Sequence, residues 1–540
     1  THLNDEGKFQ NDDGKFIIYS QCTGVYFALL YTLKEDKNPY YMDNKTLEWA
    51  IKCWDYYYTL TKEDGKTQII TFDKYWYDMY EEWCTLHWLN SILKLAPYLD
   101  DERLKRWEDR CYTSCRGIIS HVRNYYESGS LKKELDKNAV QNHYLWNVVC
   151  AYRYGQLFGD SEICKMCVDV MKAVCAAQHP AGTWLEGGSL VVGYSQVSYG
   201  ALALFNFYSK NLYPEVVKAT EKCVSYLINC YYENSNCIAA LDTRQRYKAG
   251  KGSVTCIPGS LLNLPFIRNY ASLCVKNIRE NPDIAHLHQG LGHYVESFDT
   301  IPKEMEMDLS PLSKYQQQDY SIPDMKARVI RNSGWIVAMC AHEQQVFNNR
   351  WILERMNLFS IYRSGIGELV GGGQSTSTHE LSCFNIIQYG TMEYLHRDGI
   401  LLEDKPGMGL TYNDARCSIT FEEISEKKVR VHYSIAGLLQ TAKAYVHIPL
   451  YVVKDESIMS GNITYMLNPE GYFSVGVKAK ELISLRGAKL QLDRYATLTY
   501  PVYGFNPYVP VQAPTKNEAH AVITVACDYM NPDVIFEVSV

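Results

Sequence analysis

Apolar residues in the first half of the chain recur at the spacing of helix faces. From about residue 15 to about residue 300 they return at positions i, i+3, i+4 and i+7, which is the period of an amphipathic helix. Short polar or Gly/Pro-containing turns join these segments in pairs. The pattern predicts antiparallel helix hairpins in a closed or incomplete ring, with helices at 48–60, 83–99, 144–158, 164–177 and 197–209.

The second half has a different period. After a polar stretch at 303–326 that contains two prolines, short runs appear in which apolar and polar residues alternate. Such runs, separated by Asn, Gly and Asp, are typical of strands in an antiparallel sandwich. We therefore predict a multidomain α+β protein, with an N-terminal (α/α) toroid over residues 1–320 and a C-terminal antiparallel β-sandwich over 321–540.

Composition excludes several classes of function. The 540 residues include 54 Lys and Arg against 61 Asp and Glu, and a net charge of −7 argues against a nucleic-acid-binding protein. The absence of a long uncharged apolar run argues against a membrane-spanning helix. The 44 tyrosines suit sugar stacking as well as core packing. The 18 cysteines are too dilute for a disulfide scaffold, so we expect most to be buried reduced thiols.

Cofactor content and compartment are constrained more loosely. The Gly-rich runs do not match a nucleotide-binding fingerprint, and no nucleophile elbow of a serine hydrolase is present. We expect no organic cofactor, and a structural divalent metal and the oligomeric state stay open. The chain begins at Thr1, so we expect a secreted or periplasmic protein if Thr1 is a mature start and a cytoplasmic one otherwise.

Three clusters of polar residues interrupt the helical pattern. One opens the helix at 144–158, one follows a Gly-rich loop within 183–205, and one is the densest basic run, at 242–251. Each also has a structural explanation: a helix cap for the first, core packing or a loop aromatic for the second, and a solvated loop for the third. In order, they contain Asn142 with His143, Tyr194 with Tyr199, and Arg244 with Arg246.

Together these residue types fit one reaction. Cleaving a uronic-acid polymer by β-elimination requires the sugar carboxylate to be neutralised, a base for the neighbouring proton and an acid for the departing oxygen. Asn142, with Arg244 or Arg246, could neutralise the carboxylate. His143 and Tyr194, or Tyr199 in its place, could act as base and acid. Because the ordinary pKa of tyrosine is near 10, a tyrosine base would need a cationic neighbour.

At these residues the sequence resembles a known family. A helical toroid followed by an antiparallel sandwich is similar to the polysaccharide lyases of the heparinase II/III, alginate-lyase and chondroitin/hyaluronate-lyase type. The segment QNHYLWN resembles the helix start at which these lyases carry Asn or Asn-His, and EGGSLVVGYSQVSYG resembles their Gly/Ser-rich catalytic tyrosine loop. The resemblance implies a carbon-oxygen lyase acting on an anionic polysaccharide, such as a glycosaminoglycan or an alginate-like polymer.

Further positions are candidates for substrate binding. STSTHELSCFNIIQYG is similar to the His-rich strand motif of the heparinase-type sandwich, and 390–412 resembles a Gly-Met and Pro-Gly-Thr region of the chondroitin-lyase sandwich. Aromatic residues within 71–90 could line a sugar cleft or pack in the core of a helix. The substrate-binding candidates are Arg246, Tyr75, Trp76, Trp83, Glu186 and His379, besides the catalytic candidates Asn142, His143, Tyr194, Tyr199 and Arg244.

Other functions fit the same residue types. A uronate C5-epimerase would use the same proton abstraction and return the proton to the opposite face. A glycoside hydrolase in a toroid would need two carboxylates across a cleft. A non-catalytic carbohydrate-binding protein would keep the aromatic residues alone. The carboxylates available for a hydrolase are Glu186, Asp242, Glu81 and Glu82.

Overall fold

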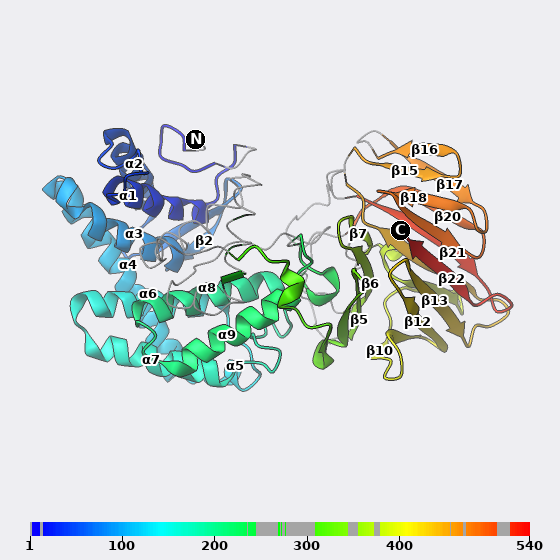
Figure 1. Cartoon of the computed structure of the whole chain (residues 1–540). Helices are drawn as coiled ribbons and strands as arrows, with labels where there is room; N and C mark the ends of the chain where they lie inside the picture. The colour runs from blue at the N-terminus through cyan, green and yellow to red at the C-terminus, as the bar shows by residue number, and fades with distance from the viewer. Residues whose placement is uncertain are drawn as a thin grey trace. The chain divides into compact units, whose positions relative to one another are not determined.

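The chain divides into two compact units in the computed structural model (Figure 1). The first unit comprises Thr1–Gly188, Gly193–Leu227 and Ser253–Ser310, and the second comprises Ser189–Val192, Ile228–Gly252 and Pro311–Val540. The structure describes residues 3–10, 14–234, 236–244, 268, 269, 272, 276, 308–343, 355–371, 378–453, 455–467, 471–504 and 519–540.

The first unit consists mainly of helix hairpins (Figure 1). Helix α1 packs against α2, α3 against α4, and α6 against α7. This confirms the predicted toroid of helix pairs. The helices are α1 (Gly24–Thr32), α2 (Asn44–Leu60), α3 (Glu82–Leu95), α4 (Asp101–Glu127), α5 (Ser130–Leu135), α6 (Asn142–Phe158), α7 (Ser161–Ala176), α8 (Val192–Tyr208) and α9 (Pro214–Asn229), with the 3-10 turns η1 (Ile18–Thr23) and η2 (Ala96–Tyr98).

The polar turns between the helices supply their caps. Asp43, Asp100 and Asp160 each accept a hydrogen bond from a backbone N–H in the first turn of the helix that follows, which satisfies a donor that has no partner within the helix. Gly159 ends α6 with a φ of 66°, a left-handed conformation that glycine adopts without steric cost. The turn residues seen in the sequence therefore set where these helices begin and end.

Helices α3, α6 and α8 run parallel to one another. In each pair of neighbouring helices, a residue near the start of one contacts a residue near the start of the other. Residues near their ends contact each other in the same way, which is possible only if the helices point in the same direction. Their amino ends therefore lie at the same end of the bundle. The contacts are His143–Glu82 (2.5 Å) and Arg153–Asn90 (3.1 Å) between α6 and α3, and Trp146–Val197 (3.0 Å) and Gln156–Tyr208 (2.9 Å) between α6 and α8.

A β-hairpin interrupts the helical unit within the aromatic stretch at 71–90. Strand β1 (Thr67–Thr71) pairs antiparallel with β2 (Lys74–Met79). The turn between them holds Phe72 and Asp73, both at positive φ. A helix over the first part of this stretch is therefore wrong, because the backbone there forms two paired strands and the helix begins only at Glu82.

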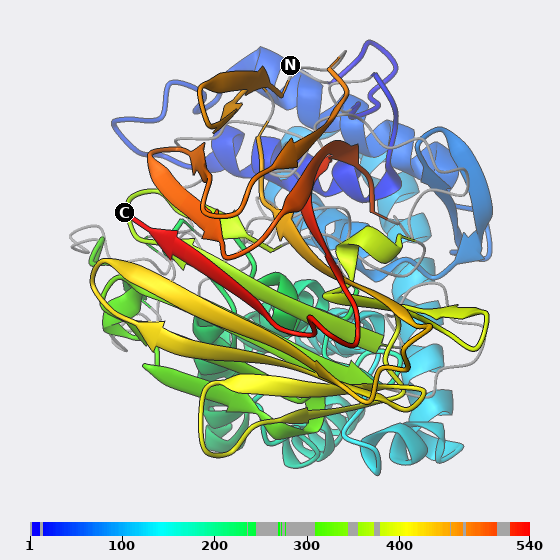
Figure 2. The same ribbon diagram turned by 90° about the vertical axis from the view of Figure 1, so that its right-hand side faces the viewer.

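The second unit is a sandwich of antiparallel sheets, as predicted. Among the described strands, one sheet has the order β10-β11-β12-β13-β22-β19-β18-β15-β16, and the other β17-β20-β21-β14-β7-β6-β5-β4-β3, with β8 paired to β14 and β9 paired to β8. Strands of the first sheet, coloured yellow, red and orange, face the viewer in Figure 2. The alternating burial along β13 (Lys428–Ala436) matches the alternation in its sequence.

The remaining bounds of this unit are as follows: β3 (Asp319–Ile322), β4 (Ala327–Asn332), β5 (Trp335–Glu343), β6 (Arg355–Arg363), β7 (Gly367–Val370), β8 (Phe384–Gln388), β9 (Thr391–Glu393), β10 (Asp398–Leu401), β11 (Gly407–Tyr412), β12 (Ala415–Ile424), β14 (Lys443–Leu450), β15 (Ser457–Ser460), β16 (Ile463–Met466), β17 (Phe473–Val477), β18 (Leu482–Leu485), β19 (Ala488–Leu492), β20 (Ala496–Val502), β21 (His520–Cys527) and β22 (Val534–Ser539), with the 3-10 turns η3 (Ala239–Leu241), η7 (Leu312–Lys314), η8 (Pro323–Met325) and η9 (His379–Leu381).

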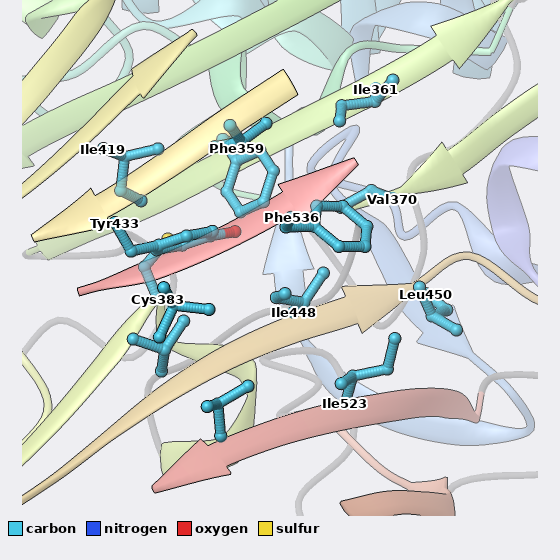
Figure 3. Packing of buried hydrophobic residues seen from close by; sticks show 14 of the residues in the cluster. Phe359, Ile361, Val370, Cys383, Ile419, Tyr433, Ile448, Leu450, Ile523 and Phe536 are labelled. Carbon is cyan, nitrogen blue, oxygen red and sulfur yellow. The ribbon is translucent and has the colours of Figure 1, made fainter. Parts of the chain in front are cut away.

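Each unit has its own core. In the sandwich, Phe359, Tyr433 and Phe536 pack with aliphatic residues from both sheets (Figure 3). In the helical unit, four tryptophans are completely buried: Trp54, Trp88, Trp107 and Trp146. The cysteines within the described ranges form no disulfides with one another and are mostly buried. Many of the chain's aromatic residues therefore serve packing.

Candidate active site

Asn142 is the first residue of α6 and is almost completely buried, at 1% exposure. The cap position belongs to Gln141, so the explanation of Asn142 as the helix cap is wrong. Its backbone N–H and its Nδ2 donate to Oε2 of Glu186 over 3.3 and 3.2 Å. Its Oδ1 is buried and accepts no hydrogen bond from the part of the chain that the structure describes. Such an atom is costly to bury, which points to a role beyond folding.

His143 follows Asn142 and forms an ion pair with Glu82, the first residue of α3. Its Nδ1 lies 2.5 Å from Oε1 of Glu82, and its ring stacks on Trp83 at 4.6 Å between centroids. The Glu82 side chain is completely buried, whereas that of His143 is 37% exposed. Burial opposes the charged imidazolium, but Glu82, Glu81 and Glu186 together raise the pKa of His143 to about 9. The imidazole is therefore protonated at neutral pH.

Glu81 lies beside this pair and caps α3. Its carboxylate accepts hydrogen bonds from the N–H groups of Trp83 and Cys84, at 3.0 and 2.8 Å, and from the hydroxyl of Tyr57 at 3.2 Å. Burial, followed by the charge of Glu82, raises the pKa of Glu81 to about 7. Two adjacent buried carboxyl groups thus begin α3, where the helix dipole favours negative charge.

Tyr194 lies in the first turn of α8 and is half-buried, so its predicted position in a loop is wrong. The bond from Trp146 to Val197 joins the residue one turn after Asn142 to the residue one turn after Tyr194. The opening turns of α6 and α8 are therefore neighbours. Tyr199, by contrast, has 0% exposure and packs as a core residue of α8, which removes it as a catalytic candidate.

The aromatic candidates separate into buried and exposed positions. Trp83 is 4% exposed, so it contacts His143 from within the core. Tyr75 and Trp76 lie on β2 and are 57% and 50% exposed. Asp73 holds the adjoining turn in place, since its Oδ1 accepts from the N–H of Phe16 and its own N–H donates to the Phe16 carbonyl, each at 3.1 Å. The two exposed rings thus sit on an anchored hairpin.

Other sequence candidates belong to the second unit or lie outside the described residues. Arg244 is in the second unit, where its N–H donates to Asp242 at 2.9 Å. Arg246 lies outside the described residues. His379 begins the turn η9 and not a strand, with its Nδ1 3.4 Å from Glu380. The first unit brings four of the predicted residues into one cluster: Trp83, Asn142, His143 and Glu186.

Sequence reasoning missed the partnership between His143 and Glu82. Glu82 was considered only as a carboxylate for a hydrolase, and 61 positions separate it from His143. Adjacent acidic residues before an apolar helix were the available signal, since they mark a helix start. No set of three or more His, Cys, Asp or Glu side chains in the described parts of the chain is arranged to hold a metal ion. The described helices include none suited to crossing a bilayer.

The chain is similar in structure to proteins of known structure. No family model and no curated protein matches its sequence. A heparinase III crystal structure superposes with a TM-score of 0.53 at 10% identity, over 98% of this chain and 77% of the other. A chondroitinase AC lyase superposes with a TM-score of 0.52 at 9% identity, over 100% and 78%. The chain has the fold of these polysaccharide lyases. Both units contribute to this lyase fold, because the similarity spans nearly the whole chain.

Proposed function

We propose that the protein is a polysaccharide lyase that cleaves a uronic-acid-containing polysaccharide by β-elimination. The observation that carries the proposal is the pair Asn142 and His143 at the start of α6. One offers a buried amide and the other a protonated imidazole that is partly open to solvent. The same two residue types that neutralise a carboxylate thus occur side by side in a chain with a lyase fold.

In the proposed reaction, the sugar carboxylate binds to the amide of Asn142 and the imidazole of His143. Neutralising this charge acidifies the hydrogen on the adjoining carbon. His143 and Tyr194 then exchange protons with the sugar: one group removes that hydrogen and one protonates the departing glycosidic oxygen. The carbon-oxygen bond breaks, and a double bond conjugated with the carboxylate forms.

Four further candidates have supporting roles in this proposal. Arg244 and Arg246 would add positive charge for the carboxylate. Tyr75 and Trp76 would stack on sugar rings, because each presents an exposed flat apolar face. None of these roles requires an organic cofactor.

The test is an assay for the new double bond. We expect ultraviolet absorbance to rise when the protein is incubated with one of a panel of heparan, chondroitin, alginate, pectate and ulvan fractions. The variant Asn142→Ala should abolish most of that rise while its circular dichroism stays that of the wild type. No rise on any acidic polymer would exclude the lyase function.

One observation favours a glycoside hydrolase as the second candidate. Three carboxyl groups, those of Glu81, Glu82 and Glu186, raise the pKa of His143. A glycoside hydrolase needs two carboxyl groups in its active site. New reducing ends without new absorbance would identify a hydrolase. A uronate epimerase would instead incorporate solvent deuterium without cleaving the chain.

A further inference from the structure

The proposed reaction assigns no role to Glu82, although its Oε1 lies 2.5 Å from Nδ1 of His143. The Glu82 side chain is completely buried. Its second oxygen, Oε2, is buried as well and finds no hydrogen-bond partner among the described residues. Burying a carboxylate costs several kcal/mol, and a close cationic partner offsets that cost. His143 is the cationic partner that contacts Glu82 in the described structure.

Two consecutive residues of α3 fix the ring of His143. Glu82 holds Nδ1, and Trp83 covers one face of the ring, with 28° between the planes. A carboxylate at one nitrogen and an aromatic ring on one face define both the position and the plane of the imidazole. Nε2 then remains as the nitrogen available to a substrate. This is the arrangement by which a third group orients a catalytic imidazole.

We propose that Glu82 is a positioning residue, which acts on the substrate only through His143 by holding Nδ1 and leaving Nε2–H for the sugar. This inference rests on the proposed lyase function for its catalytic consequence. The charged groups that face His143 are Glu81 and Glu82 from α3 and Glu186 from the segment before α8. Tyr19 of η1 packs against Trp83, the ring that stacks on His143, with 4.9 Å between the centroids of Tyr19 and Trp83.

The consequence is a division of roles. With a pKa of about 9, His143 carries a proton at neutral pH. A protonated imidazole cannot remove a proton, but it can neutralise a carboxylate or donate to a departing oxygen. Because Glu82 keeps His143 protonated, another group must act as the base, and Tyr194 is the candidate.

The test is the variant Glu82→Gln, which keeps the shape of the side chain and removes its charge. We expect the pKa of His143, followed by NMR and assigned with His143→Gln, to fall by about 1 to 3 pH units. The alkaline limb of the pH profile of kcat/KM should move to lower pH by the same amount. A merely structural role of Glu82 would change the amount of folded enzyme and leave this limb in place.

Glu81→Gln is the matched control, because it removes a buried charge from the adjacent position of the same helix start. We expect it to move the alkaline limb less than Glu82→Gln does. If the alkaline limb of the kcat/KM profile lies at the same pH in wild type and in Glu82→Gln, the proposal is overturned, even if the NMR titration of His143 shifts. If Glu82→Gln does not fold, wild-type His143 decides: a pKa near 9 supports the proposal, and a pKa at or below the ordinary value overturns it.

The NMR titration needs no substrate, so the two proposals can fail separately. A wild-type protein that cleaves no polymer defeats the lyase function, while a raised and Glu82-dependent pKa still establishes the hold on His143. A polymer that is cleaved with an unchanged limb in Glu82→Gln defeats the positioning role alone.

Discussion

Two histidines, one in each unit, have opposite charge states. In the helical unit, three carboxyl groups raise the pKa of His143 to about 9. In the sandwich, burial, followed by the charge of His379, lowers the pKa of His447 to about 3, and its Nδ1 is hydrogen-bonded to the hydroxyl of Thr524, at 3.0 Å. Burial alone makes an imidazole neutral, whereas contact with a buried carboxylate makes it a cation.

His396 shows that a nearby carboxylate is not sufficient. Its Nε2 lies 3.8 Å from Glu343, yet burial and the charges of Arg355, His342 and Lys326 lower its pKa to about 4. The contact at 3.8 Å is longer than a hydrogen bond, and cations surround it. The difference teaches that the close contact with Glu82 is what separates a charged histidine from a neutral one.

The largest effect should come from replacing His143. We expect His143→Gln to lower turnover by about 10²- to 10⁴-fold, because a group that moves or holds a proton in the transition state is lost. The measurement is initial rate from ultraviolet absorbance at saturating polymer. His396→Gln is the matched control in the sandwich and should retain wild-type turnover per folded molecule. Equal losses in the two variants would break the comparison.

The neighbouring amide should be nearly as important. We expect Asn142→Ala to reduce kcat by about 10²- to 10³-fold, as the loss of one preorganised donor does elsewhere. Asn147→Ala, which alters another buried amide of α6, serves as the control for a general disturbance of the helix. If both variants keep full activity, Asn142 has no part in the reaction.

The pH dependence of stability should have opposite signs in the two units. The lowered pKa values of His447 and His396 contribute stability above pH 6.5, which is lost as pH falls toward 4, at a cost on the order of a few kcal/mol. The raised pKa values of His143 and Glu81 contribute stability at low pH, which is lost as pH rises through about 9 and about 7.

Thermal unfolding measured from pH 4 to pH 10 checks this prediction. His447→Gln should flatten the acid limb and leave the alkaline limb, while His143→Gln should do the reverse. If neither variant changes the acid or the alkaline limb of the stability profile, other groups control the pH dependence of stability.

The smallest effect on stability should come from the exposed hairpin. Since Trp76 is 50% exposed, we expect Trp76→Ala to change the free energy of unfolding by no more than about 0.5 kcal/mol, while KM for the polymer rises. Trp83→Ala, at the buried position against His143, should cost about 3 to 5 kcal/mol. An unchanged KM in Trp76→Ala would remove the hairpin from substrate binding.

Sequence periodicity predicted the helices and the sandwich well, for a physical reason. Helices such as α7 and strands such as β13 each bury one face, so their apolar spacing follows the period of the backbone. The hairpin escaped prediction because its turn, at Phe72 and Asp73, lacks the Gly or Asn that usually marks positive φ. In the sequence, its exposed aromatic residues also resemble the apolar positions of a buried helix face.

The candidate cluster was predictable only where its residues are adjacent in sequence. Asn142 and His143 stand together, and their types point to the proposed chemistry. The contact between His143 and Glu82 depends on the parallel packing of α3 and α6, which local spacing does not encode. The burial of Tyr199 likewise depends on which face of α8 meets its neighbours.

The hydrogen bonds from Asn142 to Glu186 have a further consequence for affinity. The resting protein already holds an anion of its own at this amide, over 3.2 Å. In the proposed reaction, entry of a sugar acid at the amide is an exchange of one carboxylate for another, so the net gain per sugar unit is a small difference between similar contacts. We expect a single uronate to compete poorly and a long chain to compete well, because neighbouring units raise the effective concentration of the one being exchanged. Inhibition by monomer, tetramer and polymer, compared at equal uronate content, measures this directly, and equal inhibition by all three would contradict it.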